Sequence, residues 1–346
     1  MHRRSRRWRA NGRAATPLGV RRWRRAGRSR WCRKTPGRGE REAAYSCRAA
    51  ILSRNIRPVA NETIVKSAWW VRAIALLPLP VLHAIARGLA FLALNVLPYR
   101  PKVIRGNLST AFPEWDARTL RRTMRDFYRG YADVMLELLK AARLEPEELR
   151  RRMRLVNPEL LHAEIDAGRP VVLFAAHQCN WEWILLALSI DGLPVDCAYK
   201  PLVNEWANRE MHALRTRFGA RMVAVGDMMR DVIARRRVPR VIALVSDQEP
   251  VASDRRHWTK FLNRDSAFFM GGEVIADKLG YPAYFVAIRR VGRGRYEASF
   301  ELLAPTGATR VEGELTEVFA RRVERQIREA PADWPWSHKR WRLARD

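Results

Sequence analysis

Short apolar segments alternate with amphipathic segments over the second half of the chain. Buried strands are predicted at 170–176, 194–199, 221–225 and 241–247, followed by a hairpin of 282–290 and 295–304. Helices are predicted at 180–188, 205–218, 227–236, 272–279 and 314–330. Strands that alternate with helices in this way indicate an α/β fold, in which helices flank a central, mostly parallel sheet.

A long amphipathic helix is predicted before this alternating region. Leu120, Met124 and Phe127 recur at helical spacing, and Asp116 stands where an N-cap residue is expected. A second helical segment is predicted around 146–153. The long helix is expected to act as scaffold.

The most apolar part of the chain is 68–99. Its uncharged runs of 14 residues (73–86) and 12 residues (88–99) are separated by Arg87. Both runs are shorter than the roughly 18 residues of a clean spanning helix, and two prolines interrupt the first. Tryptophan, tyrosine and basic residues stand at its ends, as they do at membrane interfaces. We therefore predict that 61–104 is membrane-associated, either spanning or re-entrant; the alternative is a buried helical hairpin.

The formal net charge of +29 is concentrated at one end of the chain. Residues 1–60 contain 19 Arg and Lys against two acidic residues, so this segment carries +17 and the other 286 residues carry +12. A like-charged segment without an apolar period cannot bury enough surface to fold, so 1–60 is predicted to be a disordered, Arg-rich extension. It lacks the apolar core of a signal peptide. It is either a basic arm that binds RNA or phosphate, or sequence upstream of the working start.

The four cysteines indicate neither a zinc site nor a disulfide framework. Cys32, Cys47, Cys179 and Cys197 form no C-x-x-C pair and do not cluster with several histidines. Their pattern fits a reducing compartment. Cys179 is a candidate nucleophile because it lies close to His177, but a small buried filler is the simpler interpretation. The chain also lacks P-loop, dinucleotide-binding and G-x-S-x-G motifs, and no cofactor or metal is expected.

Two predicted strands end in polar residues that are suited to catalysis. His177 follows the strand at 170–176, and Asp247 closes the apolar run at 241–247. Because ligands of open α/β sheets bind at the carboxyl ends of strands, this is the layout of a candidate active site.

The spacing between His177 and Glu182 restricts how the two side chains can meet. On one continuous helix, residues five apart are separated by about 140° and cannot touch. They approach each other only if His177 lies in a turn and Asn180 caps a helix that carries Glu182 in its first turn. The carboxylate then holds one imidazole nitrogen and leaves the other to accept a proton. Since no serine or cysteine nucleophile is built in, the substrate would bring its own hydroxyl; the alternative is a capping histidine bonded to a nearby acid.

The segment HQCNWEW (177–183) resembles the H-x4-D/E motif of the glycerolipid acyltransferase superfamily, in the H-x4-E form typical of the late lipid A (lauroyl/myristoyl) acyltransferases. The resemblance runs from about residue 65 to the C-terminus. In the family's order, it includes RPKVIRGNLSTAFPEW (100–115), ALRTRFGARMV (213–223), SDQEP (246–250), the region 257–301 and PWSHKRWR (335–342). The chain departs from the family after SDQEP, where a longer basic segment replaces a Gly-rich stretch with threonines.

This resemblance implies a membrane-bound O-acyltransferase on the cytoplasmic face of a bacterial inner membrane. The donor would be acyl-acyl carrier protein and the acceptor a hydroxyl of a lipid A precursor. His177 would be the general base and Glu182 the acid that orients it. Phe268 to Met270 would line a pocket for the acyl chain or, equally, pack in the core.

Further site residues are implied by the same resemblance. The family's arginine falls on Arg215 or Arg217, where a guanidinium would bind phosphate or the developing oxyanion. Its aspartate falls on Asp247, followed by Gln248, and would support the site or bind sugar hydroxyls. The extension 1–60 has no counterpart in the family. The predicted organisation is therefore this extension, the membrane-associated segment 61–104 and an acyltransferase domain at 105–346.

Two other functions stay open at this point. The same chemistry would serve another membrane lipid, such as an ornithine lipid, a lysophospholipid or a glycolipid. A protein that binds nucleic acid through its basic arm is the alternative of another class, and Trp8, Trp23 and Trp31 do stand among arginines. No recognised nucleic-acid fold follows, however, so no nucleic-acid partner is expected. The basic surface instead fits the acidic carrier protein.

Overall fold

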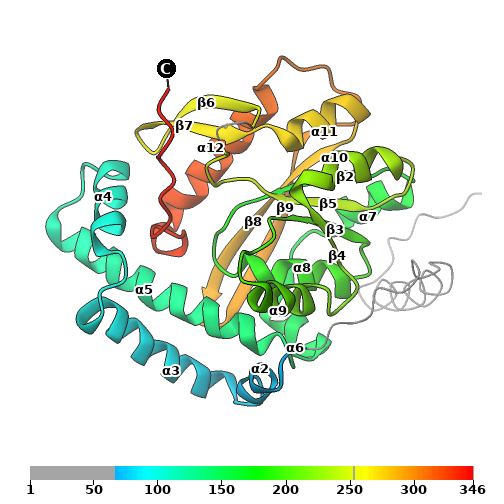
Figure 1. The fold of residues 1–346 in the computed structure, drawn as a ribbon. Helices are drawn as coiled ribbons and strands as arrows, with labels where there is room; N and C mark the ends of the chain where they lie inside the picture. Colours follow the sequence, from blue (N-terminus) through cyan, green and yellow to red (C-terminus); the bar gives the residue numbers. More distant parts are fainter. Residues whose placement is uncertain (1–66, 252–253, 346) are drawn as a thin grey trace, which may run out of the picture. The chain divides into compact units, whose positions relative to one another are not determined.

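The computed structural model describes residues 67–251 and 254–345 (Figure 1). The extension predicted at 1–60 and the first residues of 61–104 lie outside this described part. The described chain begins with α2 (Trp69–Ile74), α3 (Leu79–Phe91), the π-helical turn η1 (Leu92–Val96), α4 (Pro101–Ala111) and the long helix α5 (Ala117–Lys140). The Asp116 carboxylate accepts a hydrogen bond from the backbone N of Thr119 at 2.7 Å, so α5 begins at the predicted N-cap.

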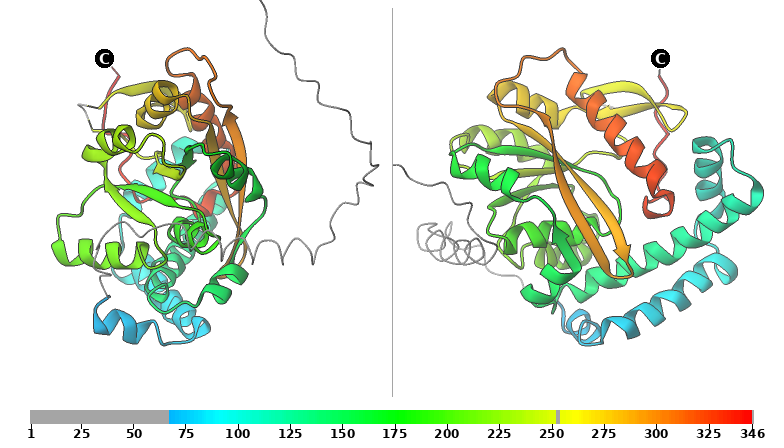
Figure 2. Two further views of the ribbon diagram at one scale, coloured as in Figure 1. Left: turned by 90° about the vertical axis from the view of Figure 1, so that its right-hand side faces the viewer. Right: turned by 180° about the vertical axis from the view of Figure 1, so that it is seen from behind.

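Together, α3 and η1 form one continuous apolar helix. Leu79–Val96 has 18 residues and is, among the described residues, the one helix long and apolar enough to cross a bilayer by length and composition. It lies alongside α5, on the side of α5 away from the sheet (Figures 1 and 2). The predicted association with a membrane stays a prediction at this point.

Seven strands form the central sheet. They are β1 (Met153–Leu155), β2 (Val171–Ala175), β3 (Val195–Tyr199), β4 (Arg221–Ala224), β5 (Val241–Val245), β8 (Ala283–Gly292) and β9 (Arg295–Ala304). Their order across the sheet is β1-β9-β8-β2-β5-β3-β4. The β8–β9 hairpin is antiparallel and the other neighbouring pairs are parallel, which confirms the predicted α/β fold with a mostly parallel sheet.

Helices cover both faces of this sheet (Figure 2). They are α6 (Pro146–Arg152), α7 (Glu159–Asp166), α8 (Trp181–Ile190), α9 (Glu205–Arg215), α10 (Val225–Ala234), α11 (Gly271–Leu279) and α12 (Glu314–Glu329), and the 3-10 turn η2 (Pro331–Asp333) follows α12. Val172 and Phe174 of β2 pack in the layer that contains α10, α11 and α12, whereas Val171 and Leu173 pack in the layer with α7 and α8. Coverage of both faces explains why the strands are continuous apolar runs in the sequence.

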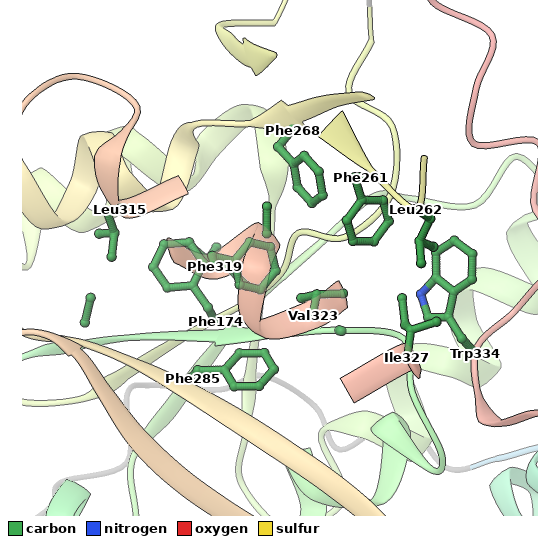
Figure 3. Packing of buried hydrophobic residues seen from close by; sticks show 14 of the residues in the cluster. Phe174, Phe261, Leu262, Phe268, Phe285, Leu315, Phe319, Val323, Ile327 and Trp334 are labelled. Atoms are coloured by element: carbon green, nitrogen blue, oxygen red, sulfur yellow. The ribbon is translucent and has the colours of Figure 1, made fainter. Parts of the chain in front are cut away.

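Aromatic side chains fill the layer between the sheet and α12 (Figure 3). The ring of Phe319 in α12 lies 5.1 Å from that of Phe174 and 6.0 Å from that of Phe285, between centroids. Phe268 is fully buried and meets the Phe319 ring edge-on at 6.1 Å. Phe268 therefore belongs to the core.

The small hairpin of β6 (Arg256–Phe261) and β7 (Arg264–Phe269) was not predicted from the sequence. Its two-residue turn consists of Leu262 and Asn263, whose φ angles are 51° and 65°. Hairpin turns with positive φ at both positions usually contain Asn-Gly or Asp-Gly. Because leucine occupies the first position here, the sequence does not indicate a turn. The three-residue strand β1 is too short for a recognisable period and is defined by its pairing with β9.

Candidate active site

The candidate active site lies at the carboxyl ends of β2 and β5. These strands are parallel neighbours, and their last paired residues are Ala175 and Val245. His177 and Asp247 each follow two positions later, so the strand register brings both to the same level. The sequence places each residue at a strand end, and the strand order makes those two ends adjacent.

His177 and Asp247 are joined by a hydrogen bond. Nδ1 of His177 lies 2.6 Å from Oδ1 of Asp247. The second carboxylate oxygen accepts a bond from Nε1 of Trp334 at 2.8 Å, and the Asp247 backbone O accepts one from Nε of Arg340 at 2.8 Å. Asp247 is fully buried, whereas the His177 side chain is 21% exposed. The imidazole is thus held through Nδ1 by a buried acid, and this bond does not involve Nε2.

The Asp247 carboxyl is ionised despite its burial. Burial alone would raise its pKa, but the charge of His177 and the hydrogen bonds from His177 and Trp334 outweigh burial and hold the pKa of Asp247 below its usual value. A carboxylate of this kind stabilises the fold above its unfolded-state pKa, and that contribution is lost as the pH falls through the folded-state pKa. Arg340 adds a nearby positive charge, although its own burial lowers its pKa to about 10.

The segment 334–341 folds over the end of β5 and supplies both Trp334 and Arg340. The guanidinium of Arg340 lies over the rings of Phe268 and Phe261, 4.3 and 5.0 Å from their centroids. It also donates to the backbone O of Ala267 at 3.1 Å. The sequence shows this segment only as a Trp- and Arg-rich ending without helical or strand period. Its place in the site follows from tertiary packing alone.

Helix α8 begins as the spacing of His177 and Glu182 requires. Asn180 is the N-cap, because its side-chain oxygen accepts a hydrogen bond from the Trp183 backbone N at 3.0 Å, and Glu182 lies in the first turn. The Asn180 amide nitrogen donates to Glu137 of α5 at 2.8 Å. Glu137 is fully buried. The start of α8 is therefore fixed to the scaffold helix.

Cys179 precedes this N-cap and is buried. Its Sγ donates to the backbone O of Ile288 at 3.4 Å. Burial raises the pKa of the Cys179 thiol well above its usual value, so the reactive thiolate is disfavoured. These features agree with a small core filler.

Glu182 is paired with Arg215 rather than with His177. Nε and Nη2 of Arg215 donate to the two Glu182 oxygens at 2.8 and 2.6 Å. The predicted contact between Glu182 and His177 is thus corrected, since the acid bonded to His177 is Asp247. The physical reason is that a buried carboxylate needs a full opposite charge, and the guanidinium fork satisfies both oxygens at once.

The structure also separates the two candidate arginines. Nη1 of Arg217 donates to the backbone O of Ala141 at 2.6 Å, which ties the loop after α9 to the end of α5. Arg215 ends α9 and faces Glu182. Gln248 follows Asp247 at a half-buried position, and its role stays a prediction.

Trp181 contacts one residue of each pair. Its ring meets the imidazole of His177 edge-on, with centroids 5.3 Å apart, and its Nε1 donates to Glu182 at 3.1 Å. A pocket of about 10 Å³, enough for one water, is lined by Trp181, Trp334 and Arg290. Among residues 67–251 and 254–345, no group of three or more His, Cys, Asp or Glu side chains is placed to hold a metal.

The chain matches the model of a known protein family. The model of a family described as bacterial lipid A biosynthesis acyltransferase matches residues 61–343. The matched range includes β2, β5, α8, α9 and the closing segment 334–341. A comparison with curated proteins finds no match.

Proposed function

The chain belongs to the bacterial lipid A biosynthesis acyltransferase family and is therefore an acyltransferase, and we propose that it moves a fatty acyl chain from acyl-acyl carrier protein to a hydroxyl of a lipid A precursor. We place this reaction on the cytoplasmic face of the inner membrane. The observation that carries the proposal is the hydrogen bond between His177 and the buried Asp247 at the carboxyl ends of two adjacent strands.

His177 is proposed as the general base. Asp247 accepts the Nδ1–H, which leaves the lone pair of Nε2 to take the proton from the acceptor hydroxyl. The hydroxyl oxygen bonds to the thioester carbonyl carbon, and the carbon–sulfur bond then breaks. The imidazolium returns its proton to the departing thiolate of the carrier's pantetheine arm. Asp247 stabilises the imidazolium between these two steps, and Gln248 is proposed to support the site.

Arg215 is proposed to bind the negative charge of the substrates. Its Nε and Nη2 are used by Glu182, so the pair holds the guanidinium plane and leaves Nη1 for a phosphate or for the oxyanion. Glu182 thus acts as a positioning residue for Arg215. Trp181, which contacts both His177 and Glu182, keeps the two pairs at a fixed separation.

Substitutions at this pair test whether it acts as one unit. We expect Arg215→Ala and Glu182→Ala each to lower the transfer rate by about 10²-fold, because each change removes the positioned guanidinium. The double variant should have the same transfer rate as the slower of the two single variants, because the two residues share one function and that function is already lost in each single variant. Arg209→Ala removes an exposed guanidinium from the same helix, so it is the matched control and should retain the wild-type kcat. Effects that multiply in the double variant would show that Glu182 and Arg215 act separately.

The acceptor is tested by mass spectrometry of lipids from a deletion strain. The proposed function predicts that lipid A loses one secondary acyl chain and that a plasmid-borne wild-type gene restores it. A gene carrying His177→Asn should not restore it at matched protein levels. Intact lipid A together with an ornithine lipid, phospholipid or glycolipid that has lost an acyl chain would contradict the proposed acceptor.

A further inference from the structure

The outer side of α3 and η1 carries a row of exposed apolar side chains. Val81, Ile85, Leu89, Leu92 and Val96 recur at helical spacing, and each is at least 43% exposed. We call these five residues the apolar stripe. Soluble monomers rarely leave a continuous apolar surface of this kind open to water, so the stripe is expected to have a partner.

The helix that carries the apolar stripe lies lengthwise on α5. Near the η1 end, the hydroxyl of Tyr128 donates to the backbone O of Tyr99 at 2.7 Å. Near the other end, Nζ of Lys140 donates to the backbone O of Leu77 at 3.0 Å. The two helices therefore run side by side in opposite directions over the whole stretch (Figure 1).

This arrangement opposes an upright orientation of α3 and η1 in a bilayer. Between the two ends, the buried pair of His83 and Glu137 joins α3 to α5 at 2.9 Å. Within this stretch of α5, from Tyr128 to Lys140, lie the exposed Arg129 and the ion pair of Asp133 with Arg293. A spanning α3 would draw these charges to membrane depth, where charged side chains are costly. The helix is long enough to span, but its packing on α5 favours a position parallel to the membrane surface.

A basic groove adjoins the η1 end of the apolar stripe. The groove lies between α4 and α5 and has a volume of about 290 Å³. Leu120 and Met124 contribute apolar surface to it, and Lys102, Arg105 and Arg121 are exposed basic residues around it. Apolar surface beside positive charges fits an amphiphile with a negatively charged headgroup.

We propose that the apolar stripe lies in the interface of an anionic bilayer, with α3 and η1 parallel to the surface, and that Lys102, Arg105 and Arg121 bind headgroup phosphates of the same leaflet. This inference deepens the membrane location included in the proposed function. It does not depend on the acyl transfer chemistry.

The same face is connected to the candidate active site. Arg100, between η1 and α4, donates through Nη1 to the backbone O of Ser337 at 3.0 Å. Ser337 belongs to the segment 334–341, whose Trp334 and Arg340 bind Asp247. A lipid acceptor in this leaflet would therefore approach the candidate active site from the side of the protein that carries the apolar stripe and the basic groove.

Vesicle flotation tests the basic groove without any acyl transfer. The full-length protein is mixed with vesicles of phosphatidylcholine alone, or with vesicles of phosphatidylcholine that contain about 30% of the anionic lipid phosphatidylglycerol. The wild type should bind the anionic vesicles more tightly, and salt should weaken the difference. Each basic residue near the surface contributes about fivefold in affinity. The variant Lys102→Gln/Arg105→Gln/Arg121→Gln should therefore bind the anionic vesicles about 100-fold more weakly than the wild type.

The matched control removes three exposed basic residues from the opposite side of the described part. Arg236→Gln/Arg237→Gln/Lys278→Gln changes the same net charge at the ends of α10 and α11 (Figure 1). It should bind anionic vesicles within about twofold of the wild type. Equal losses in both variants would show a general charge effect and would overturn the groove as a lipid site. Unchanged vesicle binding with a raised KM for acyl carrier protein would assign the groove to the carrier instead.

Cysteine labelling tests the orientation of the helix. Arg72→Cys and Lys102→Cys place thiols at exposed positions on either side of Leu79–Val96, in a background without other accessible cysteines. In inside-out membrane vesicles, a helix parallel to the surface predicts that a membrane-impermeant maleimide labels both positions without detergent. Labelling of one position only after detergent is added would show a spanning helix and would overturn the proposal.

Discussion

His177→Asn is expected to lower the rate of acyl transfer by about 10² to 10⁴-fold, because it removes the nitrogen that takes the proton from the acceptor hydroxyl. The side-chain amide of asparagine keeps a polar group beside Asp247 but cannot act as a base at neutral pH. The Km for both substrates should change little, since the loss falls on the chemical step. Purified wild type and variant should be compared at equal amounts of folded protein.

A second histidine of the chain provides the control for this substitution. Nε2 of His257 lies 2.8 Å from Oε2 of Glu317, so His257 is also paired with a carboxylate, but on the surface formed by β6 and α12. His257→Asn should leave the transfer rate within about twofold of wild type, because surface substitutions away from special features have small effects. Comparable rates for the wild type and His177→Asn would remove His177 from the mechanism.

Asp247→Asn is expected to lower the rate of acyl transfer by a similar factor, but for a different reason. The carboxylate fixes the imidazole with its proton on Nδ1 and stabilises the imidazolium, whereas an asparagine amide also donates and favours the other tautomer. We expect kcat to fall by about 10⁴-fold with little change in KM, as for the loss of the orienting acid in a catalytic triad. Raising the pH should not restore the rate, because the defect lies in tautomer and charge.

Asp191 offers a matched control for Asp247. Oδ2 of Asp191 lies 2.8 Å from Nε2 of His162, at the end of α8, so this is another aspartate–histidine contact. Asp191→Asn should retain wild-type kcat. If Asp247→Asn lowered thermal stability but left kcat intact, the role of Asp247 would be limited to holding the segment 334–341 in place.

The periodic part of the fold was predictable because its signals are local. The apolar runs at 170–176 and 241–247 correspond to β2 and β5, and the cap at Asp116 starts α5 where predicted. The order of the strands is set by long-range pairing and is not visible in any single segment. The hairpin β6–β7 has a leucine at positive φ, which local turn chemistry does not indicate.

The same distinction applies to the candidate site. The sequence identifies His177, Glu182 and Asp247 and limits the arginine to Arg215 or Arg217, and the spacing to Asn180 anticipates the cap of α8. It assigns the partner of His177 by proximity along the chain. In the structure, partners are set by strand register and by the need of each buried carboxylate for compensating groups, which reverses the assignment. The residues of the candidate site could therefore be predicted from the sequence, but the contacts between residues on different strands and helices could not.

We propose that His177, held by Asp247, takes the proton from a hydroxyl of a lipid A precursor during acyl transfer. This step is tested most directly by incubating the purified full-length protein with a defined acyl-acyl carrier protein and a lipid A precursor and measuring the acylated lipid by mass spectrometry. A new ester is expected with the wild type, and its formation should be at least about 10²-fold slower with His177→Asn. No ester with the wild type, or equal rates for the two proteins, would contradict the proposal.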